Sequence, residues 1–257
     1  MLDKLLQLIA IFLCSVCAVF LPVVGQLPPM ILFVARHFGT GVILSTGLVH
    51  LLQPAAETLS TVYDFPVAYL VCLGMIFGIL LIDGLQRRSG NSMHSHAHEY
   101  NSLEGKTSCR SAGSIIILES GILFHSIFIG ISCALADSYG LAIAVTFHQT
   151  FEGLGLGARL SSISWEKHYH PRILALLYAL ATPLGMVIGL AGVRNGAVTT
   201  AIFDAISAGI LIYSGLCESI ANELLGECLG EPLASWLLAY ASCGMGAAAM
   251  GVLALWI

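Results

Sequence analysis

Charged residues are scarce in this chain. Only 10% of its 257 residues are Asp, Glu, Lys or Arg, whereas a soluble domain carries about 25%. The net charge of -5 is small and the charges form no run of one sign, so nothing favours binding to nucleic acid. Hydrophobic residues make up 57% of the sequence, and the mean hydropathy is +0.89. This composition excludes an ordinary soluble domain and predicts an integral membrane protein in a lipid bilayer.

The sequence also lacks a phosphate-binding loop of the Walker type, so we expect no direct coupling to ATP. Eight cysteines are present, but most lie inside apolar segments, where cysteine behaves as a small hydrophobic residue. These cysteines are Cys14, Cys17, Cys72, Cys133, Cys217 and Cys243. We therefore expect them to have packing roles and not to form a disulfide scaffold.

A transmembrane helix needs about 20 mainly apolar residues. Eight segments meet this requirement, and they predict a single all-α membrane domain of eight transmembrane helices. The expected spans are approximately 5–24, 38–59, 67–85, 113–136, 139–160, 173–192, 197–222 and 233–257. The first span could instead be a cleaved signal peptide, but Asp3 and the absence of a clear small-x-small site favour a retained helix.

One substantial hydrophilic segment, 86–112, separates the third and fourth expected spans. If the N-terminus is outside, eight of the ten Lys and Arg residues lie in inner loops. The positive-inside rule then predicts that both termini are extracellular and that this loop is cytosolic. His94, His96 and His98 in the loop could bind metal loosely, as short His-rich tracts do. The alternative is a solvated loop with chance histidines.

Two consecutive apolar segments carry side chains that hydrocarbon does not tolerate. His125 lies in one, and His148 and Glu152 lie four residues apart in the next, on one face of a helix. Such groups are costly in a membrane unless they point into the bundle and find a partner. Imidazole and carboxylate together suit zinc and related divalent metals. The sequence therefore predicts an intramembrane metal site, although three polar groups bonded to neighbouring helices would give the same pattern.

Three further polar residues are candidates for the path of an ion. His50 lies deep in the second expected span, Glu119 lies on the cytosolic side of His125, and Glu218 lies toward the inner end of the seventh span. Glu119 could receive a departing ion, or it could form a structural pair with Asp83 or with a basic loop residue. The same two alternatives, a place on the path of the ion and a structural pairing, apply to Glu218.

The run His-Gln-x-Phe-Glu-Gly-Leu-Gly-Leu-Gly at 148–157, preceded by Phe-His-Ser at 124–126, resembles the ZIP (Zrt/Irt-like) family of divalent metal transporters. The sequence of these motifs is most similar to the fungal and plant branch of that family. The resemblance covers most of the chain, and it extends to residues 39–50, 182–183 and 207–213.

The resemblance implies an eight-helix bundle with extracellular termini that moves zinc, or iron, manganese or cadmium, into the cytosol by alternating access. It also implies that His125, His148 and Glu152 bind the transported ion, with Ser126 and Gln149 beside them. The ion is then the substrate, and no prosthetic cofactor is expected. The plasma membrane is the expected location, with an internal membrane as the alternative, and a homodimer is an assembly that the sequence allows.

Some relatives hold a second metal through further carboxylates, but the corresponding places here are Ile129 and Thr182. We therefore expect one main ion in the centre. Two other kinds of metal protein fit the sequence less well than a transporter does. A membrane-embedded zinc hydrolase would need a tightly held metal, whereas a transport site must also release its ion. A haem-binding bundle would use His125 and His148 as axial ligands but would leave Glu152 unexplained.

Overall fold

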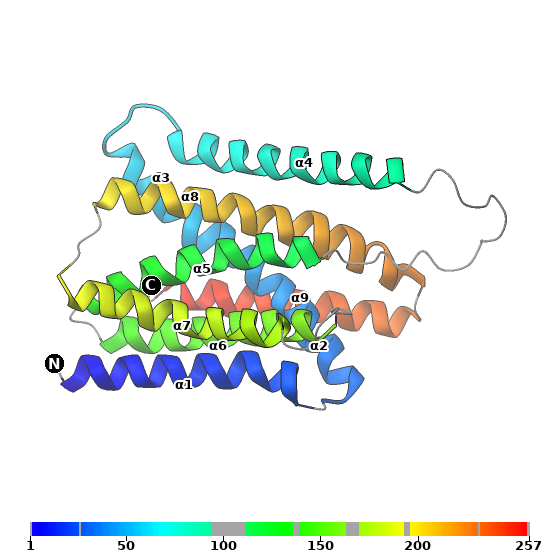
Figure 1. The fold of residues 1–257 in the computed structure, drawn as a ribbon, viewed down its shortest axis with the longest axis horizontal. Helices are drawn as coiled ribbons and strands as arrows, with labels where there is room; N and C mark the ends of the chain where they lie inside the picture. Colours follow the sequence, from blue (N-terminus) through cyan, green and yellow to red (C-terminus); the bar gives the residue numbers. More distant parts are fainter. Residues whose placement is uncertain are drawn as a thin grey trace.

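Figure 1 shows the computed structural model of the chain. The structure describes residues 2–25, 27–93, 112–135, 139–162, 170–192, 196–230 and 232–255. The long helices run roughly along one axis, and both ends of the chain lie at the same end of the bundle, which we call the terminal end (Figure 1). The opposite end, where α4 ends and α5 begins, is the loop end.

Within the described residues every regular element is helical. The elements are α1 (Leu2–Val24), α2 (Pro29–Ser45), η1 (Thr46–Leu52), α3 (Gln53–Ser60), α4 (Val67–Met93), α5 (Ala112–Leu135), α6 (Tyr139–Ser161), α7 (His170–Leu190), α8 (Ala197–Tyr213), η2 (Ser214–Leu224), η3 (Glu227–Gly230) and α9 (Leu233–Leu253). Here η1 and η2 are π-helical and η3 is a 3₁₀ helix.

Seven helical segments in the described part of the chain are long and apolar enough to cross a membrane. This confirms the expected all-α membrane protein. The helix α6 is not among the seven, and it carries His148, Gln149, Glu152 and Arg159. All four of these side chains are buried inside the bundle. The polar side chains of α6 are therefore shielded from the surroundings of the bundle.

Some helices extend beyond the apolar segments of the sequence. The helix α2 begins at Pro29, ahead of the span expected from residue 38, because proline is well suited to the first turn of a helix. The helix α4 continues to Met93, into the segment 86–112 that was expected to be a loop. Residues 86–93 contain no proline that would end the helix earlier.

The segments α2, η1 and α3 form one helical span from Pro29 to Ser60. Its π-helical part lies immediately before Pro54. Proline has no backbone N–H, and its ring would collide with the carbonyl of His50, so regular α-helical bonding cannot continue there. His50 itself lies in this widened turn.

The packing of the helices divides the bundle into two groups. In the first group, α5 packs along α7, and α1 packs along α6 and α7. In the second group, α2 packs along α9, and α8 packs against α4, η1 and α3. The main contacts between the groups are those of α2 with α6 and of α5 with α8.

The contact between α2 and α6 depends on two glycines that face each other. A Cβ atom on Gly39 would overlap the Cα atom of Gly155, and a Cβ atom on Gly155 would overlap the Cα atom of Gly39. Small residues at such positions let two helix backbones approach closely. Glycine at both positions therefore sets the separation between the two groups of helices.

Candidate metal centre

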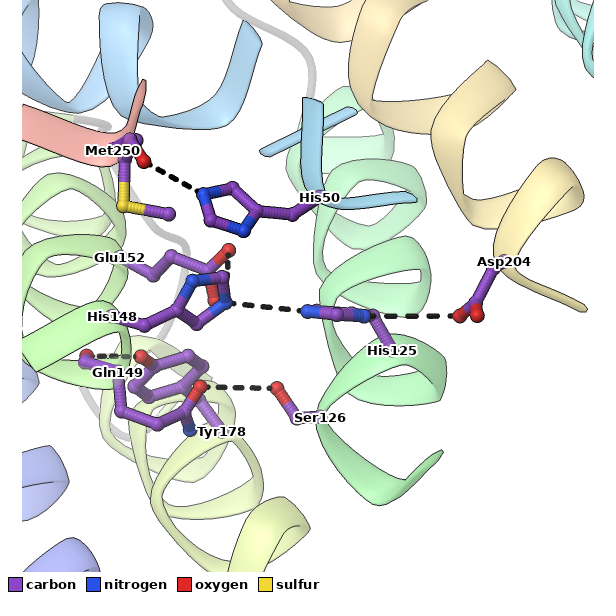
Figure 2. A network of polar contacts seen from close by, with 9 residues as sticks. All are labelled: His50, His125, Ser126, His148, Gln149, Glu152, Tyr178, Asp204 and Met250. Carbon is purple, nitrogen blue, oxygen red and sulfur yellow. Dashed lines mark hydrogen bonds and ion pairs between the residues drawn. The ribbon is translucent and has the colours of Figure 1, made fainter. Parts of the chain in front are cut away.

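Three donor atoms from α5 and α6 converge inside the bundle (Figure 2). His125 Nε2 lies 3.2 Å from His148 Nε2, and His148 Nε2 lies 3.3 Å from Glu152 Oε1. One donor atom from each of the three residues can be chosen so that all lie within 4.8 Å of one another. The α-helical rise places His148 and Glu152 one turn apart on the same face, and the packing of the bundle places His125 opposite them.

These separations fit a single tetrahedral ion. Zinc bonds to nitrogen and oxygen are about 2.0–2.2 Å long, so two ligands of a tetrahedral zinc lie about 3.4 Å apart. The two close separations at this centre, 3.2 Å and 3.3 Å, are near that value. The imidazoles and the carboxylate can therefore contact one ion with only small movements.

The burial of the three residues also favours a cation. His125, His148 and Glu152 are 4%, 0% and 1% exposed. Neither Glu152 oxygen takes part in a hydrogen bond among the described residues, and neither does Nδ1 of either histidine. Burying a carboxylate without such partners is unfavourable. A divalent ion between these groups would compensate that cost.

Ser126 and Gln149, which follow His125 and His148 in the chain, pair with each other across α5 and α6. The Ser126 hydroxyl lies 3.5 Å from Gln149 Oε1, to which it donates. The Tyr178 hydroxyl of α7 donates to the backbone carbonyl of Gln149 (Figure 2). These contacts link the three helices α5, α6 and α7 directly beside the metal centre.

His50 of η1 lies at the edge of the same centre, with its ring centroid 5.3 Å from that of His148. Its Nε2 atom donates a hydrogen bond of 2.8 Å to the Met250 carbonyl of α9. A carbonyl oxygen only accepts, so the ring hydrogen is on Nε2 and the lone pair is on Nδ1. His50 is therefore close to the centre, but its bonded nitrogen points away from it (Figure 2).

A family model described as ZIP zinc transporter matches residues 2–113 and 84–254. The chain belongs to the ZIP zinc transporter family. This family consists of membrane transporters of zinc and not of enzymes, so the zinc-hydrolase alternative has no support. The resemblance noted in the sequence is thereby confirmed.

Curated relatives agree with this assignment. Zinc-regulated transporter 2 of Saccharomyces cerevisiae is 26% identical over 395 residues, covering 98% of this chain and 94% of the relative. Zinc-regulated transporter 1 of Schizosaccharomyces pombe is 31% identical over 309 residues, covering 86% of this chain and 74% of the relative. Zinc transporter 3 of Arabidopsis thaliana is 29% identical over 288 residues, covering 98% of this chain and 84% of the relative.

The other residues singled out in the sequence of this ZIP protein do not all join the centre. Glu119 of α5 is buried nearer the loop end, and no hydrogen bond reaches either of its oxygens among the described residues. The alternative pairing with Asp83 is therefore wrong as a hydrogen bond, and Asp83 instead accepts one from the Tyr213 hydroxyl at 3.1 Å. The Glu218 side chain lies outside the described residues. So do the histidines of the loop, which are His94, His96 and His98.

The two positions considered for a second metal carry no carboxylate. Ile129 packs against an apolar cluster that includes Val145 and Met186. Thr182 is fully buried on α7, and its hydroxyl has no hydrogen-bond partner among the described residues. The side chains at these two positions therefore cannot supply the negative charge that a second ion would need.

Asp204 of α8 lies beside the candidate metal centre, although the sequence analysis assigned it no role. Its Oδ1 atom lies 3.9 Å from Nδ1 of His125, on the side of the ring that faces away from His148 (Figure 2). The only signal in the sequence was a carboxylate within an apolar segment. Its contact with His125 is set by the packing of α8 on α5.

A cavity of about 600 Å³ reaches the centre from the terminal end of the bundle, and we call it the vestibule. Its lining includes both His125 and Leu255, the last described residue. The polar side chains that line it include His50, Gln53, Glu57, Thr200 and Asp204. The centre is thus connected to the surroundings on the side where both chain ends lie.

Proposed function

We propose that this protein moves zinc into the cytosol through the centre formed by His125, His148 and Glu152. The observation that carries the proposal is the convergence of three buried donor atoms within 4.8 Å of one another, in a member of a zinc transporter family. The vestibule supplies a route from one side of the bundle. We assign Ser126 and Gln149 to positions beside the ion.

The division of the helices into two groups supports alternating access. All three proposed ligands lie on α5 and α6 of the first group, whereas His50 and Asp204 lie on the second group. The two groups meet at the glycine pair Gly39 and Gly155, where the two helix backbones approach closely. We propose that the first group moves against the second and carries the ion with it.

We further propose eight transmembrane helices. The helix α6 has 23 residues and is therefore about 35 Å long, enough to cross a hydrocarbon core of about 30 Å. Adding it to the seven apolar segments gives an even number, which agrees with both chain ends lying at one end of the bundle (Figure 1). With the positive-inside rule, the terminal end and the vestibule are extracellular.

The same orientation assigns the remaining polar residues to the cytosolic side. We propose that Glu119 and Glu218 lie on the path of the departing ion, and that the histidines of the segment 86–112 bind it loosely on arrival. The absence of a carboxylate at Ile129 and Thr182 supports one main ion in the centre.

Several finer assignments are also part of the proposal. Iron, manganese and cadmium are proposed as further substrates, because imidazole and carboxylate ligands bias metal choice without fixing it. The plasma membrane is the proposed location, with an internal membrane as the alternative. A homodimer is the proposed assembly, and chemical crosslinking in native membranes would distinguish it from a monomer.

Uptake of radiolabelled metal into proteoliposomes tests the function directly. The purified chain should give saturable zinc uptake, and iron, manganese and cadmium should be compared under the same conditions. His148→Ala should abolish zinc uptake while the protein remains folded and inserted. Wild-type zinc uptake by this variant at equal protein content would refute the assignment of the centre.

A further inference from the structure

His125 presents one ring nitrogen to the metal centre and the other to Asp204 (Figure 2). Nε2 faces His148, and Nδ1 lies 3.9 Å from Asp204 Oδ1. This separation is too long for a hydrogen bond, and no other hydrogen bond reaches Nδ1 among the described residues. The His125 side chain is only 6% exposed. A buried polar nitrogen is thus aimed at a carboxylate that it does not touch.

The space around this pair is reached from the terminal end. His125 and Asp204 both line the vestibule, together with the hydroxyl residues Ser132 and Thr200. Asp204, Ser132 and Thr200 also line an adjacent cavity of about 280 Å³. The Asp204 side chain is 18% exposed. Oxygen donors and an imidazole nitrogen therefore meet where two cavities adjoin.

We propose that Asp204 and Nδ1 of His125 form an outer station, a binding site that holds a divalent cation before it reaches the transport centre. This inference rests on the proposed transport function and adds a separate site to it. Mixed nitrogen and oxygen ligands suit first-row divalent metals. The ligands of a tetrahedral zinc lie about 3.4 Å apart, so the 3.9 Å gap needs only a small side-chain movement to close on an ion.

The remaining coordination positions at the outer station are filled by water or by the nearby hydroxyl groups, because the vestibule is open to the surroundings. With two strong protein ligands instead of three, the station binds an ion more weakly than the inner centre. Weak binding is what a capture site requires, since the ion must be released inward.

The outer station and the inner centre cannot both use His125 in the same protein molecule. A neutral imidazole has one hydrogen and one lone pair. An ion on Nδ1 leaves the hydrogen on Nε2, which can then donate to His148 Nε2 across 3.2 Å. An ion on Nε2 leaves the hydrogen on Nδ1, facing Asp204. When the ion passes from Nδ1 to Nε2, one proton moves from Nε2 to Nδ1 through vestibule water. The imidazole of His125 therefore gains and loses no proton overall.

The outer station also joins the two groups of helices, because His125 belongs to α5 and Asp204 belongs to α8. The pair is close in the arrangement seen here, in which the vestibule reaches His125. A movement of the first group against the second would separate the two residues. The station therefore exists only while the centre is accessible from the terminal end.

Calorimetric titration of the purified full chain with zinc tests the outer station apart from transport. The double variant His148→Ala with Glu152→Ala removes the inner ligands and keeps His125 and Asp204. It should still bind one zinc, at least about tenfold more weakly than wild type. Adding Asp204→Asn should abolish this binding. The matched addition of Glu57→Gln removes the same charge from the same vestibule without a contact to His125, and it should leave the binding intact.

Three results would overturn the outer station. They are no zinc binding by the correctly folded double variant, zinc binding that survives the addition of Asp204→Asn, or a loss of zinc binding with Glu57→Gln that equals the loss with Asp204→Asn. Gel filtration establishes whether each variant is folded. If the double variant does not fold, single Asp204→Asn in proteoliposomes decides the question. It should raise the KM for zinc uptake about tenfold and leave kcat nearly unchanged.

The uptake measurement also separates this inference from the proposed function. Asp204→Asn with a wild-type KM would refute the outer station in a protein that still transports. A fall in kcat with an unchanged KM would show instead that Asp204 only positions His125. Absence of zinc uptake by the wild-type protein would refute the proposed function, whatever the effect of Asp204.

Discussion

Replacing Glu152 by Gln tests the metal centre sharply, because it removes the only formal negative charge among the three donors and keeps the shape of the side chain. Glu152 is 1% exposed, and neither of its oxygens takes part in a hydrogen bond among the described residues. A buried carboxylate in this condition is unfavourable. Glu152→Gln should therefore not lower the stability of the zinc-free protein.

A structural role for Glu152 leads to the opposite expectation. Its Oε1 atom lies 3.3 Å from His148 Nε2, and the two could form an ion pair that holds α6 in place. Breaking a buried ion pair by removing one charge costs about 3–5 kcal/mol. The sign of the stability change without zinc thus distinguishes a metal ligand from a structural partner.

The size of the zinc effect follows from the same geometry. Substituting a residue that only supports a metal ligand weakens metal binding by about 10–100-fold. Loss of a direct donor that also carries the charge should cost at least about 100-fold, or about 2.8 kcal/mol. At a zinc concentration 100 times the wild-type Kd, zinc stabilises the wild type by about 2.7 kcal/mol and the variant by at most about 0.4 kcal/mol.

Thermal unfolding of the purified protein in detergent, with and without zinc, measures both quantities. Glu57→Gln is a suitable control, because Glu57 is an exposed vestibule carboxylate that accepts a hydrogen bond from Gln53 at 3.1 Å. It should retain the stabilisation by zinc. A Glu152→Gln protein with the wild-type zinc response, or one that is clearly less stable than wild type without zinc, would refute the reasoning.

Three further predictions follow from the packing and the topology. Gly39→Val should abolish zinc uptake, because its side chain would collide with the backbone at Gly155; Gly74→Val, where a Cβ meets nothing within 4 Å, should retain uptake in the same assay. A cysteine placed at Ser102 should react with a membrane-impermeant reagent only after permeabilisation, and labelling of intact cells would overturn the proposed orientation. Replacing the three histidines of the segment 86–112 by Ser should change uptake modestly, mainly in metal-replete cells, without altering substrate preference; complete loss of transport would place the loop on the obligatory path.

Local spacing in the sequence was enough to predict the all-α membrane class and to bring together two of the three residues of the candidate metal centre. An apolar run of about 20 residues indicates a transmembrane helix, and this holds whichever helices pack beside it. His148 and Glu152 share a face because the helical repeat alone brings residues four apart together. The polar run that includes these two residues also lowers the hydropathy of α6, so α6 is less apolar than the seven described segments that are long and apolar enough to cross a membrane.

The sequence could not predict how the helices pack against one another. His125 is 3.2 Å from His148 because α5 packs along α7, and α1 packs along both α6 and α7, so that α5 and α6 are brought together. Asp204 reaches His125 only because α8 packs on α5. The alternative considered for Glu119, a pairing with Asp83, is not found for the same reason, since Asp83 of α4 accepts a hydrogen bond from Tyr213 of α8.

Sequence spacing fixes the direction of a side chain only relative to its own helix, through a repeat that every α-helix shares. The distance between side chains on different helices depends on the separation, rotation and shift of those helices. In this bundle the separation of the helices depends on close contacts such as that of Gly39 with Gly155, which are far apart in the chain. The rotation and shift of the helices also depend on the π-helical turn before Pro54, where the backbone departs from the α-helical repeat. The sequence therefore determined which side chains could bind a metal, and the tertiary structure alone decided which of them meet.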